Sequence, residues 1–207
     1  MPPDQANSPA MRLLVVVLAG GEGQRMGGGK PQCLLGGLTL MERAWGLASG
    51  WSDDVRVGLR SEDQASDLER PVLLDDPEIE GPLSALAAAR AAAGRDDRTH
   101  ILTIPCDMPF LPDDLVQRLA SAMGERGVAV AAMQGQLVPV CALWTLCALE
   151  QLPAYVAGGR RSLKGLAQSV GVAAVDVPAE WLVNINTPEE LAAAERRLQS
   201  EIQHVDH

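Results

Sequence analysis

The most informative part of the sequence is LLVVVL at residues 13–18, together with the segment AGGEGQRMGGGK that follows it at residues 19–30. A short apolar run rich in β-branched valine is typical of a strand buried on both faces, as in a parallel sheet. The glycines that follow allow backbone N–H groups to approach and wrap an anion without Cβ clashes. A buried strand that leads directly into such a loop predicts a phosphate-binding site at the end of the first strand.

The rest of the chain alternates between strand and helix patterns. Further extended segments are predicted at residues 54–59, 72–74, 101–104, 128–132, 138–143 and 172–177. Helices are predicted at residues 38–49, 83–93, 113–123 and 162–169, and a last helix begins at the capping box Thr187-Pro188-Glu189-Glu190. This alternation predicts an α/β fold, with a three-layer, doubly wound and mostly parallel sheet in a single domain.

Composition excludes several classes of protein. The formal net charge is -10 and no basic stripe appears, which argues against a nucleic-acid partner but not against one small polyphosphate. No apolar run approaches the roughly 20 residues that a membrane helix needs, so we expect no membrane partner. The four cysteines include no C-x-x-C pair, which favours a reducing compartment and a cytoplasmic location.

The glycine-rich loop carries two basic residues, Arg25 and Lys30, which can grip phosphate oxygens. It fits neither of two common phosphate-binding patterns. Met26 stands where the dinucleotide fingerprint needs its third glycine, and Pro31 stands where a P-loop needs Ser or Thr. The alternative interpretation is a flexible glycine-rich loop that binds no ligand.

An aspartate, Asp107, follows the strand at residues 101–104 and is a candidate Mg²⁺ ligand, because Mg²⁺ commonly takes one or two carboxylates plus substrate phosphates. Ligands of doubly wound sheets lie beyond the carboxyl ends of the strands, so this segment and the glycine-rich loop should share one crevice. The alternative is an aspartate that only caps the next turn.

Two other polar segments follow predicted strands. Asp75 and Asp76 could accept hydrogen bonds from a ribose or a guanine edge, although a solvated acidic loop is the alternative. Asn184 and Asn186 precede the last helix, and their amides suit neutral, bidentate recognition of a ligand. An ordinary Asx turn would also explain this pair.

Four motifs in this order resemble those of the molybdenum cofactor guanylyltransferases. They are the loop at residues 18–30, Gly81-Pro82-Leu83, Pro105-Cys106-Asp107-Met108-Pro109 and Asn184-Ile185-Asn186-Thr187-Pro188. The resemblance implies a Rossmann-like nucleotidyltransferase fold and the transfer of GMP from GTP to molybdenum-bound molybdopterin, with release of pyrophosphate. It implies Mg²⁺ as cofactor, and molybdoenzyme acceptors or other cofactor-biosynthesis proteins as further partners. The expected organisation is a disordered lead-in at residues 1–11, a nucleotidyltransferase domain at 12–200 and a tail at 201–207.

The resemblance also implies a role for individual residues. The nucleotide would be bound by Leu18, Ala19, Gly20, Gly21, Lys30, Asp107 and an aspartate at 75 or 76. Asp107 would hold Mg²⁺, Arg25 and Lys30 would take part in catalysis, and Asn184 and Asn186 would lie on the pterin side.

The sequence departs from the guanylyltransferase motifs at two places, and three other functions remain as alternatives. Gly29 stands where many guanylyltransferases have Asp, and Gly58-Leu59-Arg60 lacks an asparagine that some members have. The related cytidylyltransferases usually have Ala-Ala-Gly in the loop and an acidic residue near position 186, so Gly20-Gly21 and Asn186 favour guanine. The alternatives are a molybdopterin cytidylyltransferase, a sugar-phosphate nucleotidyltransferase and a non-catalytic GTP-binding cofactor carrier.

Overall fold

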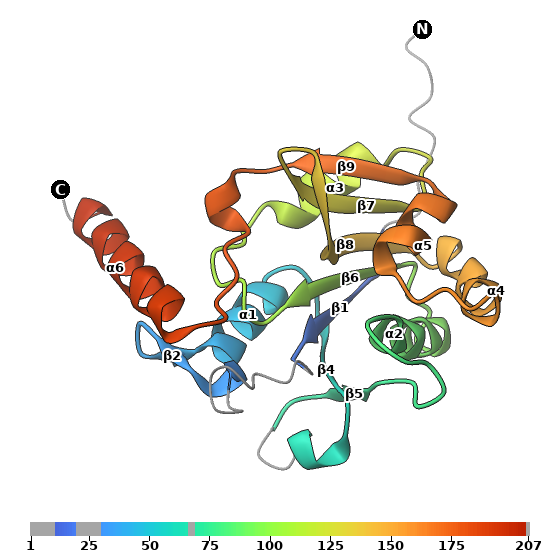
Figure 1. Cartoon of the computed structure of the whole chain (residues 1–207), viewed down its shortest axis with the longest axis horizontal. Helices are drawn as coiled ribbons and strands as arrows, with labels where there is room; N and C mark the ends of the chain where they lie inside the picture. The colour runs from blue at the N-terminus through green and yellow to red at the C-terminus, as the bar shows by residue number, and fades with distance from the viewer. Residues whose placement is uncertain (1–10, 20–29, 66–68, 206–207) are drawn as a thin grey trace, which may run out of the picture.

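The computed structural model describes residues 11–19, 30–65 and 69–205. A seven-stranded sheet in the order β5-β4-β1-β6-β8-β7-β9 forms its centre (Figure 1). Only β8 is antiparallel to its neighbours, so the sheet is mostly parallel as predicted. The strands are β1 (Leu13–Leu18), β4 (Asp54–Leu59), β5 (Val72–Leu74), β6 (His100–Pro105), β7 (Val128–Met133), β8 (Gln136–Thr145) and β9 (Val172–Asp176).

Helices cover both faces of the sheet and create two apolar cores. Side chains alternate along β1, with Leu13, Val15 and Val17 in one core and Leu14 and Val16 in the other. The first core includes residues of α1 (Leu40–Ser49) and α3 (Leu115–Met123). The second includes residues of α2 (Leu83–Arg95), α4 (Leu152–Ala157) and α5 (Leu163–Val170). The three-layer, doubly wound fold is therefore confirmed, and the all-apolar sequence of β1 follows from burial on both faces.

A small hairpin replaces the predicted start of the first helix. Strands β2 (Leu34–Leu35) and β3 (Leu38–Thr39) pair around Gly36 and Gly37, which have φ angles of 59° and 80°. Glycine adopts such left-handed conformations without a steric cost. The helix starts at Leu40 rather than residue 38, because Thr39 is its N-cap and forms a capping box with Glu42.

Other boundaries differ in small ways from those expected. Helix α3 starts at Leu115 instead of residue 113, and α2 continues through Gly94 to Arg95. Helix α4 was not predicted, since it has only six residues. Helix α6 (Pro188–Val205) extends into the segment expected as a tail. Short 3₁₀ helices are η2 (Lys30–Gln32), η3 (Glu62–Ala65), η4 (Ala148–Gln151) and η5 (Ala179–Trp181). Among the described helices, none has the length and apolar character that crossing a membrane requires.

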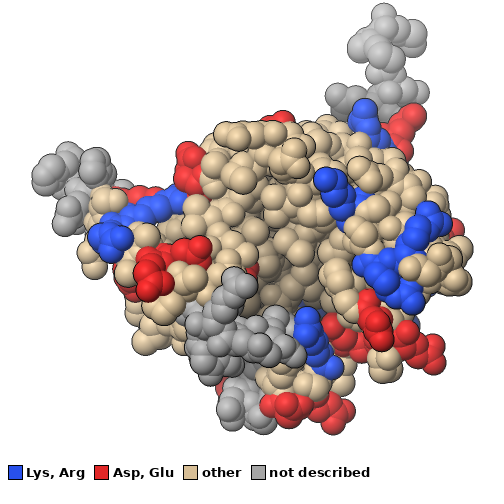
Figure 2. All heavy atoms as spheres, in the orientation of Figure 1, with Lys and Arg blue, Asp and Glu red and all other residues tan. Residues whose placement is uncertain are grey.

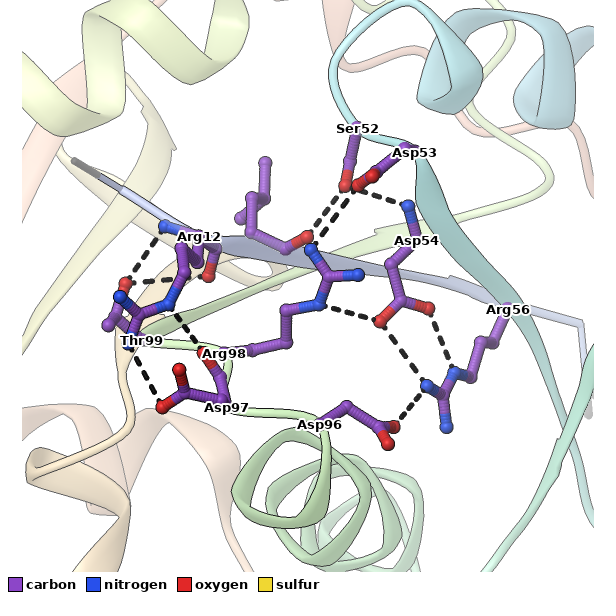
Figure 3. A network of polar contacts seen from close by, with 10 residues as sticks. Arg12, Ser52, Asp53, Asp54, Arg56, Asp96, Asp97, Arg98 and Thr99 are labelled. Atoms are coloured by element: carbon purple, nitrogen blue, oxygen red, sulfur yellow. Dashed lines mark hydrogen bonds and ion pairs between the residues drawn. The ribbon is translucent and has the colours of Figure 1, made fainter.

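A group of ion pairs, here called the amino-end network, joins the start of β1, β4 and β6 (Figure 3). Asp54, only 11% exposed, accepts hydrogen bonds from Arg56 and contacts the Nε atom of Arg98 at 2.9 Å. Asp96 pairs with Arg56 and Asp53 with Arg98. The start of β1 joins the group through Arg12, which contacts Asp97 and Thr99, and through the Ser52 hydroxyl, which donates to the Leu13 carbonyl. Because β1, β4 and β6 are parallel, this network lies at the opposite edge of the sheet from their carboxyl ends.

Candidate active site

The candidate site lies where β1 and β6 end side by side. Leu18 and Pro105 are register partners at the last residues of the two strands. The ladder continues just past them, because the amide of Ala19 donates to the Gly58 carbonyl at 3.0 Å and the amide of Cys106 donates to the Leu18 carbonyl at 3.1 Å. The glycine-rich loop and the Asp107 segment therefore begin at the same edge of the sheet.

The surface is hollowed in this region. Figure 2 shows a central depression between the part of the molecule that carries α6 and β2 and the part that carries α4 and α5. Its visible walls are mostly neither basic nor acidic, and charged side chains gather around the rim. Such a depression can hold a nucleotide while charged groups around the rim meet its phosphates.

The structure joins Asp107 directly to the asparagine pair, although 76 residues of chain separate Asp107 from Asn184. The amide of Ile185 donates to the Asp107 carbonyl at 2.9 Å, and the Ile185 side chain is fully buried. Asn184 and Asn186 flank this anchor on either side. Oδ1 of Asp107 and Oδ1 of Asn184 are both buried. Oδ1 of Asn184 accepts no hydrogen bond from any described residue, and an unsatisfied buried acceptor is costly unless a ligand or water supplies a donor.

The two acidic candidates after β5 have different surroundings. Asp75 is partly buried, and its Oδ2 accepts a hydrogen bond from the Oγ of Ser84 at 2.8 Å. Oδ1 of Asp76 instead accepts from the backbone amide of Glu78 at 2.9 Å, which is an Asx turn. The Asp76 carboxylate therefore has a structural role in its own loop, whereas Asp75 is held between the sheet edge and the start of α2.

The electrostatics of Asp75 reflect this position. Burial raises the pKa of Asp75, while the hydrogen bond from Ser84 and the charge of Arg60 act in the opposite direction. The net direction is upward, so the ionised form is held at some cost in stability. Sequence reasoning missed both Ser84 and Arg60 as neighbours of this carboxylate. Arg60 could have been found, because it directly follows β4 at the same sheet edge.

Part of the predicted site lies outside the described residues, namely Gly20, Gly21 and Arg25, and for Lys30 only the backbone is described. Lys30 begins η2, and Cys33 follows three residues later. Cys33 and Phe110 both pack against the cluster that contains Ile185. Three residues of chain span at most about 11 Å, so the Lys30 backbone lies within that distance of Cys33.

The residues at this edge fit a magnesium ion shared with a substrate. The described part of the chain contains no group of three or more His, Cys, Asp or Glu side chains that could hold a metal by themselves. Asp107 offers one carboxylate two residues after the end of β6. Mg²⁺ keeps several water ligands and is often held by one or two carboxylates plus substrate phosphates, so one aspartate is a sufficient protein ligand.

Comparison with known proteins adds an independent line of evidence. Residues 15–171 match the MobA-like NTP transferase domain. The chain is 38% identical over 197 residues to the molybdenum cofactor guanylyltransferase of Cereibacter sphaeroides, covering 92% of this chain and 100% of that protein. Two solved structures, each under 25% identical, share the fold. One is molybdopterin-guanine dinucleotide biosynthesis protein A from Archaeoglobus fulgidus, with a TM-score of 0.73 and 23% identity, covering 90% of this chain and 98% of that one. The other is 2-C-methyl-D-erythritol 4-phosphate cytidylyltransferase from Thermus thermophilus, with a TM-score of 0.65 and 21% identity, covering 91% of this chain and 100% of that one.

Proposed function

The chain belongs to the MobA-like NTP transferase family, and on this premise we propose that it is a molybdenum cofactor guanylyltransferase. It transfers GMP from GTP to the terminal phosphate of molybdenum-bound molybdopterin and releases pyrophosphate. The similarity to the Cereibacter sphaeroides enzyme extends over 92% of the chain and the whole of that protein, so it includes every segment of the candidate site.

The observation that carries this proposal is the hydrogen bond from the Ile185 amide to the Asp107 carbonyl. An enzyme that joins two phosphorylated substrates needs its nucleotide side and its acceptor side next to each other. Asp107 follows β6 on the nucleotide side, and Asn184 and Asn186 flank Ile185 on the acceptor side. Holding the two segments in direct backbone contact supports a reaction between a bound nucleotide and a second bound ligand.

In the proposed reaction, an oxygen of the molybdopterin phosphate forms a bond to the α-phosphorus of GTP. The bond between the α-phosphorus and the oxygen that bridges it to the β-phosphorus breaks. The electron pair of that bond leaves with pyrophosphate. The residues position two anions and offset the negative charge that develops on the leaving group. Arg25 and Lys30 supply positive charge for the leaving pyrophosphate, and Asp75 binds the nucleoside.

Magnesium completes the proposed site. Asp107 is the residue that would hold it. When bound, Mg²⁺ neutralises negative charge on the phosphate oxygens and so stabilises the transition state. No general base is needed at this site, because a phosphate monoester has its second pKa near 6 and is mostly ionised at neutral pH.

The choice of GTP rests on sequence rather than on the fold. The fold is shared with a cytidylyltransferase, so the architecture alone does not select the base. Gly20-Gly21 and Asn186 favour guanine, and the most similar relative quoted above is a guanylyltransferase. A molybdopterin cytidylyltransferase is the alternative that these residues disfavour.

The test is pyrophosphate release with GTP, CTP and ATP, each alone, with molybdenum-bound molybdopterin, and with a sugar 1-phosphate. We expect release only when GTP and molybdopterin are both present, with Mg²⁺ in the buffer. Release with CTP and molybdopterin would instead identify a cytidylyltransferase, and release with a sugar 1-phosphate would identify a sugar-phosphate nucleotidyltransferase. Binding of GTP with no release under any condition would identify a carrier and overturn the proposal.

A further inference from the structure

Helix α6 contacts three segments at the candidate site. Its Ala194 shares a buried apolar cluster with Leu35 of the β2–β3 hairpin and with Ile185, and Phe110 packs against this cluster. The carboxylate of Glu195 accepts a hydrogen bond from the amide of Gly36 at 2.7 Å. The helix therefore holds the hairpin, the Asp107 segment and the asparagine segment from one side (Figure 1).

Arg197, near the middle of α6, joins two of these segments through a single side chain. Its guanidinium carbon lies 3.8 Å from the centroid of the Phe110 ring. Its NH1 donates a hydrogen bond to the carbonyl of Glu180 in η5. Its Nε donates to Glu201 at 2.8 Å, one helical turn further along. The Arg197 side chain is only 28% exposed, so it is packed between these partners rather than extended into solvent.

The two partners lie close in sequence to the proposed functional residues. Phe110 is three residues beyond Asp107, and Glu180 is four residues before Asn184. Between them, the hydrogen bond from Ile185 to Asp107 sets how the two segments align. A group that fixes Phe110 and Glu180 at once therefore limits how far the Asp107 segment can slide along the asparagine segment.

We infer that Arg197 is a positioning residue, which holds the metal-side segment and the pterin-side segment in register without touching either substrate. This inference rests on the proposed function. Arginine suits the role because its planar guanidinium can stack on an aromatic ring and donate in its own plane at the same time. Lysine keeps the charge but lacks the planar fork, so it should restore the function only in part.

The test compares Arg197→Ala and Arg197→Lys with Arg196→Ala. Arg196 is the adjacent residue of equal charge, and it is exposed. In Arg197→Ala we expect kcat/KM for molybdopterin to fall roughly tenfold or more, because small misplacements of reacting groups are costly. The KM for GTP should change much less, because the contacts of Arg197 are to Phe110, Glu180 and Glu201 and none of them is to β1 or β4, where the nucleotide-side segments start. For Arg197→Lys, kcat/KM for molybdopterin should lie between the values of Arg197→Ala and the unaltered protein. Arg196→Ala should have the same kcat/KM as the unaltered protein.

A second readout does not depend on catalysis. The amide of Ile185 is protected by its bond to Asp107, so hydrogen exchange reports directly on the alignment of the two segments. We expect Arg197→Ala to speed exchange at Ile185 while amides of β1 keep their protection. A double-mutant cycle with Phe110→Leu should be non-additive in both readouts, because the two side chains act as one contact.

The outcomes separate this inference from the proposed function. Faster exchange at Ile185 in a chain that releases no pyrophosphate would support the positioning role while the proposed function fails. Unchanged exchange at Ile185 and unchanged kinetics in an active Arg197→Ala protein would overturn the inference alone. Faster exchange throughout β1 together with a lower unfolding midpoint would also overturn it, because Arg197 would then have only a general structural role.

Discussion

Asp107 is the residue on which the proposed chemistry depends most. We expect Asp107→Asn and Asp107→Ala to lower pyrophosphate release by on the order of a hundredfold or more, because loss of the metal ligand removes several kcal/mol of charge stabilisation. The fold should persist, since the backbone carbonyl that binds Ile185 is unchanged by either substitution. Thermal unfolding and a pyrophosphate assay together check this. Asp113→Asn is the matched control, because Asp113 is exposed and follows β6 in the same loop.

Asp75 offers a prediction in which binding and stability change in opposite directions. Burial raises its pKa in the folded state, so its ionised form costs stability at pH above that pKa, and the cost disappears below the ordinary pKa of aspartate, about 4. Asp75→Asn should therefore raise the unfolding midpoint at pH 7, and the gain should shrink as the pH falls towards 4. GTP affinity should drop roughly tenfold, as expected when a charged hydrogen-bond acceptor is lost.

The neighbouring aspartate provides the control for this experiment. In Asp76→Asn the amide oxygen can still accept from the Glu78 backbone, so the turn should survive. Both stability and GTP affinity should then be nearly unchanged. The opposite result, with GTP affinity lost in Asp76→Asn and kept in Asp75→Asn, would move the nucleoside contact to Asp76. Calorimetric titration with GTP and thermal unfolding between pH 4 and 7 give both quantities.

At the residue scale, the sequence pointed to polar side chains that follow strands. It gave no signal for side chains whose partners are distant in the sequence. Asp107 was recognisable because it closely follows β6, at the strand ends where doubly wound sheets bind ligands. Asn184 was recognisable because it shortly precedes the capping box that starts α6. Ser84 and Arg197 were not recognisable, since their significance comes from Asp75 and Phe110, which are nearby only after folding. No local pattern in α6 distinguishes Arg197 from the exposed Arg196.

At the scale of single elements, the start of α6 determines how the asparagine segment is held. The carboxylate of Glu190 accepts hydrogen bonds from the amides of Asn186 at 2.6 Å and Thr187 at 3.0 Å. Glu190→Ala should cost about 1 kcal/mol of unfolding free energy, as for other lost helix caps. It should also raise the KM for molybdopterin, because the Asn186 backbone loses its anchor. Chemical denaturation and steady-state kinetics measure the two effects.

Glu189→Ala is the matched control for the cap, because Glu189 is exposed, equally charged and adjacent. It should change neither the unfolding free energy nor the KM for molybdopterin by much. If both substitutions had equal effects, the charge at the start of α6 rather than the hydrogen bonds of Glu190 would explain them.

The strand most directly predictable from sequence was β1, because a strand buried on both faces stands out as a continuous apolar run. The predicted bounds of β4 and β5 also match the structure, whereas β8 is two residues longer at each end than predicted. The β2–β3 hairpin was missed, since each of its strands has only two residues. The Gly36-Gly37 pair was a usable signal for it, as glycine pairs commonly form two-residue hairpin turns.

At the scale of the whole molecule, alternation of strands and helices was enough to predict a doubly wound sheet, but not the direction of β8. That strand is antiparallel because β7 and β8 are joined by a tight turn at Gln134 and Gly135, whose φ angles are 50° and 75°. A parallel neighbour would need a much longer crossover connection. The Gly135 turn was the local evidence for this reversal, and strand periodicity alone could not reveal it.

The molecule also separates its stabilising charges from its candidate site. The amino-end network lies at the start of β1, β4 and β6, and the candidate site lies at their far ends. Asp54→Ala leaves Arg56 and Arg98 without their shared carboxylate in a largely buried setting. We expect it to cost about 2 kcal/mol of unfolding free energy, somewhat less than fully buried pairs lose. That loss lowers the unfolding midpoint by about 4–8 °C in a chain of this size.

Catalysis should not share this loss of stability, because the network lies at the amino ends of β1, β4 and β6 and the candidate site at their carboxyl ends. Per folded molecule, Asp54→Ala should keep kcat and both KM values at temperatures well below its midpoint. Asp53→Ala is the control, since Asp53 is 86% exposed and its pair with Arg98 should contribute less than about 1 kcal/mol. A fall in kcat for Asp54→Ala without unfolding would show that the two edges of the sheet are energetically coupled. Equal stability losses in the two variants would show that burial of Asp54 adds nothing to its ion pairs.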